Sequence, residues 1–203
     1  MPNYCSNYIS VRGTNSAEVK RLADAFDAGE LCEAVIPVPE ILRDTTAPTQ
    51  PDDAAAAERK AQTGYDNWYD FCVARWGTKW DISCQGECDR DEDGLGFNGP
   101  FDTAWSPPIG VVEQLAEQGY QVTLYYNETG MGFVGKFEDG EDFCYDYGGF
   151  DSINVRSVIG DELDDFFGIS EQMAEIEAEN AEEEEELTEW LKDGIEKRSL
   201  IAE

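Results

Sequence analysis

Apolar and polar residues alternate with a period of two near the start of the chain and then change to a helical period. Residues 7–13 place Ile9 and Val11 on one face, which predicts a half-buried strand. Four apolar residues then recur at helical spacing and predict a helix. Ser16 is its expected N-cap, and Gly29 stands just beyond its end.

The middle of the chain predicts an insertion followed by a helix and a strand. Residues 36–66 contain four prolines and an Ala-rich charged patch, which indicates a surface insertion with one short helix near residues 53–62. The aromatic residues from Trp68 to Trp76 can share one helical face. Residues 79–85 alternate with a period of two and predict a strand.

The second half of the chain predicts a strand, a helix, a strand and a hairpin. They are expected at residues 97–105, 106–119, 120–127 and 132–147, in that order. The hairpin should turn at Asp139-Gly140, a common two-residue hairpin dipeptide. The whole order is βαββαβ with an added hairpin. It predicts an α+β, ferredoxin-like fold in which one antiparallel sheet is backed by helices.

Composition divides the chain into a core-forming part and an acidic extension. The 203 residues are 41% hydrophobic and 12% aromatic, with 45 acidic and 14 basic residues and a formal net charge of -31. Seventeen of the acidic residues and three of the basic ones lie in residues 161–203, where repulsion opposes compact packing. We therefore expect a ferredoxin-like domain over residues 1–160 and an acidic, helical C-terminal extension over residues 161–203.

The acidic extension predicts a charged helix capped by Ser170. An interrupted apolar stripe follows at Met173, Ile176, Asn180, Leu187 and Leu191. A helix that carries many carboxylates offers a line charge comparable to duplex DNA, which has roughly one charge per 1.7 Å of axis. A frayed, solvated tail is the alternative, because consecutive glutamates repel one another. The candidate partner-binding residues are Asp161, Glu162, Asp164, Asp165, Glu175, Glu179, Glu182, Glu183, Glu184, Glu185 and Glu186.

The chain contains no histidine, which removes most of the chemistry that would indicate an enzyme. Without imidazole there is no Ser-His-Asp or Cys-His nucleophile and no side chain with an unperturbed pKa near neutrality. A pair of carboxylates could act as acid and base, but among 45 acidic residues such pairs arise by chance. We expect a protein that binds rather than catalyses, with no cofactor.

Six cysteines lie at irregular spacings, and no basic segment or apolar run precedes them, which indicates reduced thiols in a cytoplasm. Cys84 and Cys88 could supply half of a zinc site. No second closely spaced pair accompanies them, so two neighbouring thiols are the simpler interpretation. No stretch approaches 18 consecutive apolar residues, and we expect no membrane contact.

Residues 89–94 match the first half of a calcium-binding loop. Asp89, Asp91 and Asp93 stand at alternate positions, followed by a glycine. The second half fails, because Pro100 occupies the position that requires a bidentate glutamate. The three aspartates are therefore a weak calcium candidate, and we expect no metal site.

Six aromatic residues could form a surface on which nucleic-acid bases stack, as on the sheet of an RNA-recognition domain. They are Tyr4, Trp68, Trp76, Trp80, Trp105 and Tyr125. The charge of the chain opposes this function, because phosphate binding needs clustered Lys and Arg. We favour core packing for these side chains and expect no direct binding of nucleic acid.

Three blocks of sequence together resemble a known family. They are Met1-Pro2-Asn3-Tyr4-Cys5-Ser6-Asn7, the aromatic block from Asn67 to Asp81, and Phe101-Asp102-Thr103-Ala104-Trp105-Ser106-Pro107-Pro108. In content and order they resemble the YubB-type ferredoxin-like domain of phage, prophage and conjugative-plasmid proteins. Together with the stretch from Asn127-Glu128 to Gly135, the resemblance spans about residues 1–138, leaves the acidic segment outside and supplies no catalytic residues. It implies a mobile-element origin and a bacterial host cytoplasm.

Two functions remain, and both are binding functions. The first is inhibition of a host nucleic-acid-binding defence protein, of the anti-restriction or anti-CRISPR type, whose basic cleft would take up DNA-mimic-like charge. The alternative is a regulatory or assembly adaptor. In that case the folded domain binds a host or phage protein, and the acidic tail only keeps the chain in solution.

Overall fold

The computed structural model describes residues 3–201, with side-chain surroundings as far as Leu191. The chain packs as two units, residues 1–146 and residues 147–203. The first holds the sheet and the second is helical. The boundary between them falls earlier in the chain than the division at residue 160 that composition suggested. In the part of the chain that is described, no helix has the length and apolar character needed to cross a membrane.

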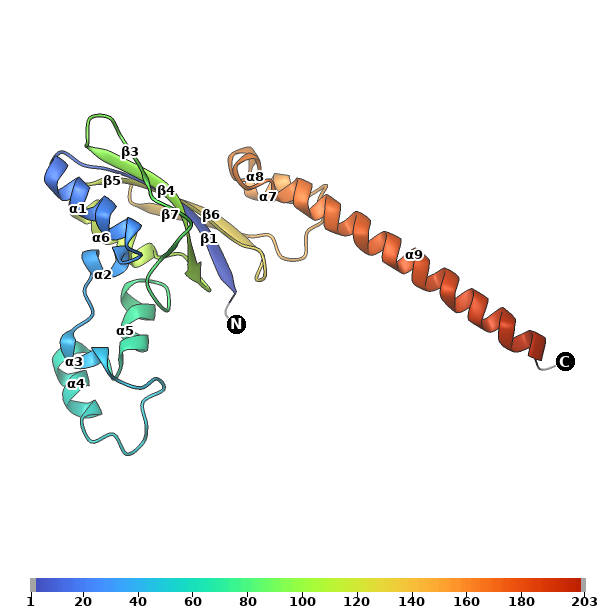
Figure 1. The fold of residues 1–203 in the computed structure, drawn as a ribbon, viewed down its shortest axis with the longest axis horizontal. Coiled ribbons are helices and arrows are strands. Elements are labelled where there is room, and N and C mark those ends of the chain that lie inside the picture. Colours follow the sequence, from blue (N-terminus) through green and yellow to red (C-terminus); the bar gives the residue numbers. More distant parts are fainter. Residues whose placement is uncertain (1–2, 202–203) are drawn as a thin grey trace. The chain divides into compact units, whose positions relative to one another are not determined.

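One antiparallel sheet organises the first unit (Figure 1). Its strands are β1 (Tyr4–Arg12), β2 (Ser83–Cys84), β3 (Asp89–Arg90), β4 (Gly96–Ala104), β5 (Gln121–Glu128), β6 (Phe133–Glu138) and β7 (Glu141–Asp146). They are ordered β2-β4-β1-β5-β6-β7, and β3 also pairs with β4. Strand β1 is antiparallel to both β4 and β5. The predicted βαββαβ order, and with it the α+β ferredoxin-like fold, is confirmed.

Two helices lie against one face of this sheet (Figure 1). They are α1 (Ser16–Asp27) and α6 (Ile109–Glu117). The period of two in β1 buries Ile9 and Val11 as predicted. From α1, Phe26 packs against Phe97 and Phe101 of β4, with ring centroids 5.8 and 5.7 Å apart. Each fully buried side chain of this size contributes roughly 1.5–3 kcal/mol to stability, so this layer is the core of the unit.

Residues 28–75 form further helices. They are α2 (Leu31–Val35), α3 (Glu40–Arg43), α4 (Ala56–Thr63) and α5 (Trp68–Arg75). The helices predicted near residues 53–62 and from Trp68 onward are confirmed as α4 and α5, whereas α2 and α3 were not predicted. Asn67 caps α5 by accepting the backbone N–H of Asp70 at 2.9 Å.

The strand predicted over residues 79–85 is wrong except for β2, the part that pairs with β4. The side chain of Asp81 explains the difference. Its carboxylate accepts the backbone N–H groups of Cys32 and Glu33, each at 2.8 Å. It also accepts the N–H of Ile82 at 2.9 Å. The segment before β2 therefore caps α2 instead of extending the sheet.

The predicted hairpin is confirmed as β6 and β7, paired from Phe133 opposite Asp146 to Glu138 opposite Glu141. At its turn, Asp139 and Gly140 both have positive φ, 54° and 83°. Positive φ at both central residues is typical of a type I′ turn, whose twist matches that of the flanking strands.

The second unit consists of α7 (Val155–Ile159), α8 (Asp161–Phe167) and α9 (Ile169–Ile201). Helix α9 continues through the five consecutive glutamates, so the predicted helical extension is present as one long helix. Gly168, with φ of 65°, separates α8 from α9.

Two predicted N-caps are wrong. At α1 the cap is Asn15 rather than Ser16, and its side chain accepts the N–H of Ala17 at 3.0 Å. At the start of α9, Ser170 is a donor rather than a cap. Its backbone N–H and its hydroxyl both donate to the carboxylate of Asp164, each at 2.7 Å.

A substitution in α6 tests how closely α5 and α6 pack. Helix propensity favours alanine over glycine by about 1 kcal/mol, but a Cβ on Gly110 would overlap the carbonyl oxygen of Arg75. We predict that Gly110→Ala lowers the free energy of unfolding by about 1–3 kcal/mol in urea denaturation. A more stable variant would contradict this packing.

Candidate functional site

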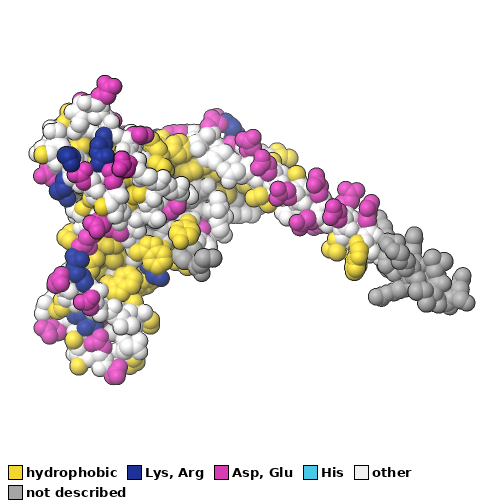
Figure 2. Space-filling model, viewed as in Figure 1, with side chains coloured by type: hydrophobic (Ala, Val, Ile, Leu, Met, Phe, Trp, Pro, Cys, Tyr) yellow, Lys and Arg dark blue, Asp and Glu magenta, His cyan; other side chains and the backbone are white. Residues whose placement is uncertain are grey.

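Helix α9 presents an acidic face. Glu175, Glu179, Glu182 and Glu186 stand at i, i+4, i+7 and i+11, which brings them to one side of the helix, and all four are exposed. Figure 2 shows acidic side chains along this helix. From Glu175 to Glu186 the face is about 16.5 Å long, at about 1.5 Å per residue. Glu183, Glu184 and Glu185 add exposed carboxylates around it.

These seven glutamates lack cationic partners in the described part of the chain. None of its Lys or Arg side chains lies within ion-pair distance of them. Like charges at helical neighbour positions destabilise a helix, by roughly 0.2–0.5 kcal/mol per pair. The acidic face is therefore a surface on which added positive charge would be favourable.

The candidates on α8 are engaged within their own unit. Arg156 pairs with Asp161 at 2.7 Å, Asp164 at 3.1 Å and Asp165 at 2.8 Å. Asp164 is only 2% exposed and holds the first turn of α9. Its prediction as a partner-binding residue is therefore wrong, because tertiary packing has buried it. Glu162 is exposed on α8.

A second face of α9 is apolar and exposed. Its exposed members are Ile176, Leu187, Trp190 and Leu191, at 56%, 57%, 70% and 49%. Asn180 interrupts this stripe, as the sequence indicated, and Met173 is half-buried. Glu183 stands seven residues after Ile176 and four before Leu187, so a carboxylate also lies within this apolar stripe.

The aromatic residues of the first unit divide into buried and exposed ones. Trp76 is 4% exposed and donates its Nε1–H to the carbonyl of Ile36 at 2.8 Å. Trp68 and Tyr125 are half-buried. The exposed ones are Tyr4, Trp80 and Trp105, at 55%, 37% and 47%. Core packing is therefore correct for Trp76 and wrong for these three.

Trp80 and Trp105 border a groove on the first unit. Three hollows, of about 630, 280 and 180 Å³, share Lys79 as a lining residue. Trp68 lines the first two and Tyr69 lines the first and third. We call the surface formed by Trp68, Tyr69, Lys79, Trp80 and Trp105 the aromatic groove.

Lys79 is held by aromatic rings rather than by a carboxylate. Its Nζ lies 4.5 Å from the ring centroid of Trp80 and 6.0 Å from that of Tyr69. Cation–π contacts of this kind contribute about 0.5–2 kcal/mol. Arg43, which also lines the groove, pairs with Glu33 and Glu40, whereas no described carboxylate pairs with Lys79. The sequence pattern alone did not single out Lys79 as a site residue, although it stands between Trp76 and Trp80.

The two loops that carry the groove are bonded to each other. Thr78 Oγ1 donates to the carbonyl of Ala104 at 3.0 Å and accepts the N–H of the same residue at 3.2 Å. Ser106 Oγ donates to the carbonyl of Gly77 at 2.5 Å. These bonds tie the loop before β2 to the end of β4, so Lys79, Trp80 and Trp105 stand on one connected platform.

Trp105 has a left-handed backbone, with φ of 72°. Such a conformation costs a non-glycine residue roughly 1–3 kcal/mol and persists only where the surroundings impose it. Here the N–H of Trp105 donates to the carbonyl of Asn3 at 3.0 Å. Backbone strain of this kind clusters at active sites and ligand-binding sites, which makes Trp105 a candidate contact residue.

The calcium candidate does not assemble. Arg12 forms ion pairs with Asp91, at 2.5 Å, and with Asp93. Asp93 also accepts the N–H of Leu95 at 2.9 Å, while Asp89 lies exposed on β3. Among the residues that the structure describes, no three His, Cys, Asp or Glu side chains are grouped to hold a metal.

The thiols of Cys84 and Cys88 are poor metal ligands and nucleophiles at neutral pH. Burial raises the pKa of Cys84 to about 11 and that of Cys88 to about 12, and nearby Asp27 adds to both. Cys84 donates to the carbonyl of Phe26 at 2.7 Å. A thiolate is the reactive form, so these side chains act as small core residues.

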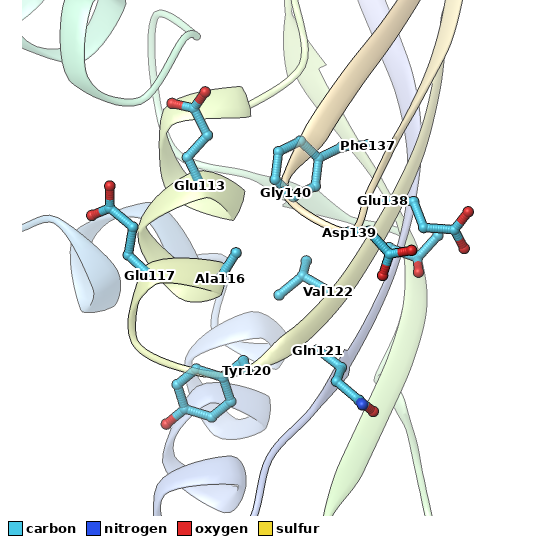
Figure 3. A pocket seen from close by; sticks show the side chains of 11 residues that line it. Glu113, Ala116, Glu117, Tyr120, Gln121, Val122, Phe137, Glu138, Asp139 and Gly140 are labelled. Atoms are coloured by element: carbon cyan, nitrogen blue, oxygen red, sulfur yellow. The ribbon is translucent and has the colours of Figure 1, made fainter.

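Another hollow of the first unit, of about 760 Å³, lies beside α6 and the turn between β6 and β7 (Figure 3). Glu113, Glu117, Glu138 and Asp139 line it. Figure 3 shows these carboxylates pointing in different directions rather than toward one point. The arrangement is that of a solvated acidic surface and not of a catalytic or metal site.

Fold and surfaces together define a ferredoxin-like domain followed by a long acidic helix. Sequence comparison then identifies the family: the model for the ferredoxin-like domain in Api92-like protein matches residues 76–189, and the chain belongs to this family. The match supports the ferredoxin-like part of the sequence resemblance. It runs on into α9, where the resemblance had been expected to exclude the acidic segment.

Comparisons with solved structures and with curated proteins do not identify a function for the candidate surfaces. The crystal structure of a protein api92 from Yersinia pseudotuberculosis is 12% identical, with 73% of this chain and 99% of that chain covered and a TM-score of 0.37. No curated protein matches this chain. The candidate surfaces therefore rest on their own geometry.

A matched pair of substitutions tests the anchor of α9. We predict that Asp164→Asn lowers the free energy of unfolding of the second unit by about 1–3 kcal/mol, because it weakens a buried, charged acceptor. Asp165→Asn removes an exposed carboxylate with the same partner, Arg156, and should cost less than about 1 kcal/mol. Urea denaturation followed by far-UV circular dichroism measures both, and equal effects would contradict the anchoring role.

Proposed function

We propose that this chain is a non-catalytic binding protein whose helix α9 occupies a basic, nucleic-acid-binding cleft of another protein. The observation that carries this proposal is the continuous, exposed helix through Glu182–Glu186, with no cationic partner among the described side chains. A cleft lined with Lys and Arg supplies the positive charge that the acidic face lacks.

The spacing of charge on α9 supports competition with nucleic acid. Ten glutamates lie between Glu171 and Glu189, both included. They span about 27 Å of helix, or about one charge per 2.7 Å, against about one per 1.7 Å in duplex DNA. A cleft that binds phosphates by charge therefore has a comparable attraction to this helix.

The biological setting is part of the same proposal. The sequence resemblance to the YubB-type domain implies a phage or mobile-element protein acting in a bacterial cytoplasm. A host defence protein that binds nucleic acid, of the anti-restriction or anti-CRISPR target type, has the cleft that the acidic face requires. The competing function is an adaptor that binds through the first unit, with α9 only keeping the chain in solution.

Neutralising the run of glutamates separates these two functions. The variant carries Glu182, Glu183, Glu184, Glu185 and Glu186→Gln, which keeps side-chain length and helix propensity. Its control, Glu87, Glu92, Glu113, Glu117 and Glu141→Gln, removes the same charge from exposed positions of the first unit. Partners are captured from a bacterial lysate at two salt concentrations, and their affinities are then measured.

We predict that the α9 variant binds its partner about tenfold or more weakly and with less salt dependence, since exposed ion pairs contribute up to about 1 kcal/mol each. The control should bind normally. If the α9 variant and the control bind the partner equally well, the proposed function is wrong and the adaptor function is favoured.

A second prediction concerns nucleic acid itself. Because the chain lacks a basic cluster, it should not shift DNA or RNA in a mobility assay at about 0.15 M salt, where the screening length is about 8 Å. A shift by the purified chain would refute the mimic mechanism.

A further inference from the structure

We infer that the aromatic groove of the first unit binds an extended peptide segment in which an acidic side chain lies beside proline or aromatic residues. The inference concerns a surface in the first unit and stands independently of the role proposed for α9.

The shape of the groove favours an extended chain. Its three hollows are joined by shared lining residues, so successive side chains of one peptide can enter them in turn. Their walls are ring-bearing or branched apolar side chains: Pro48, Trp68, Tyr69, Val73, Trp80 and Trp105. Aromatic walls of this kind bind proline and aromatic side chains through flat, apolar contact.

One cation of the groove, Lys79, can bind a ligand carboxylate. Lys79 lines all three hollows, and the acids near it already have other partners. The carboxylate of Asp81 accepts three backbone N–H groups, and that of Asp66 pairs with Lys60 at 3.4 Å. Asp70 accepts from the side chain of Asn67 at 2.9 Å. A ligand carboxylate would give the Lys79 ammonium its missing counter-charge.

The same charges disfavour nucleic acid in this groove. A single ammonium compensates one carboxylate, whereas a polynucleotide brings a phosphate with every base. A chain of net charge -31 repels that polyanion. A peptide with one acidic residue is therefore the ligand class that the groove fits.

The groove is also formed before any ligand arrives. The bonds of Thr78 and Ser106 fix its two loops, and the left-handed backbone of Trp105 fixes the direction of an exposed indole. Binding to such a surface loses little conformational freedom, which is how a short peptide can reach useful affinity.

Peptide selection on the full-length chain tests the inference. A library of random twelve-residue peptides is panned against the chain, and the best peptide is titrated against Lys79→Met, Trp80→Ala and Trp105→Gly. The control is Trp190→Ala, which removes an exposed indole from α9. Trp105→Gly removes the indole while keeping the left-handed backbone accessible, and a melting curve of each variant shows whether lost binding comes from unfolding.

We expect selected peptides that share an acidic residue next to proline or an aromatic residue. Each groove variant should weaken binding about tenfold or more, as truncation at a binding hot spot does, and the control should bind like the native chain. Replacing the peptide's acidic residue by its amide should weaken binding to the native chain but not to Lys79→Met.

Three results would overturn the inference. One is a selection that yields no binding peptide, and another is a peptide that binds the groove variants as well as it binds the native chain. The third is a single-stranded oligonucleotide that binds with the same dependence on Lys79, Trp80 and Trp105, which would assign the groove to nucleic acid.

Discussion

The chain has only 14 cationic side chains for 45 acidic ones. The repulsion between acidic segments within each folded unit is therefore reduced only where those cations lie. Arg12, at the end of β1, pairs with Asp91 and Asp93 in the loop before β4. Arg90 on β3 pairs with Asp24 and Asp27 of α1. Each exposed pair is worth only about 0–1 kcal/mol. Their greater effect is to place one positive charge between acidic segments that would otherwise repel each other.

Two described surfaces, the acidic face of α9 and the aromatic groove, carry charges that these ion pairs do not balance. The first carries unpaired negative charge and the second an unpaired positive charge. Among the residues that the structure describes, Glu182–Glu186 of α9 pair with no cation, and Lys79 in the aromatic groove pairs with no carboxylate. One surface is long, helical and dominated by charge; the other is compact, aromatic and fixed by hydrogen bonds between loops. Attraction to the first depends strongly on salt, whereas contact with indole rings does not. The two surfaces therefore suit partners of different chemistry.

Periodicity predicted the long elements because each buries one face. Strand β1 and helices α1 and α6 follow such patterns, and the Asp139-Gly140 turn has its own backbone signature. Hydrogen bonds between a side chain and a distant segment produce no periodic pattern in the sequence. Asp81 bonds to Cys32 and Glu33, almost fifty residues away, and this prevented a longer strand. Helix α2, with five residues, is too short to show a period.

The same limit applies to the candidate site. Asp164 and Asp165 are adjacent aspartates that the sequence pattern cannot tell apart. Packing nevertheless buries Asp164 and leaves Asp165 exposed. The sequence likewise favoured core packing for Trp76, Trp80 and Trp105, whereas of these three only Trp76 is buried. Which side of a loop an indole faces is decided by contacts with β4, and those contacts lie far away in the sequence.

Strand β7 has a consequence for how copies of the chain can associate. It is the last strand in the sheet order, pairs with β6 on one side, and exposes all six of its residues. An exposed edge strand can pair with the edge strand of another copy, and repeated pairing builds fibrils, unless charged side chains or a covering element prevent it. Glu141 and Asp142 at one end of the strand and Asp146 at the other place charge along this edge. Their charge, added to the net charge of -31 on the chain, opposes edge-to-edge pairing between copies, so β7 can stay at the edge of a sheet without a covering element.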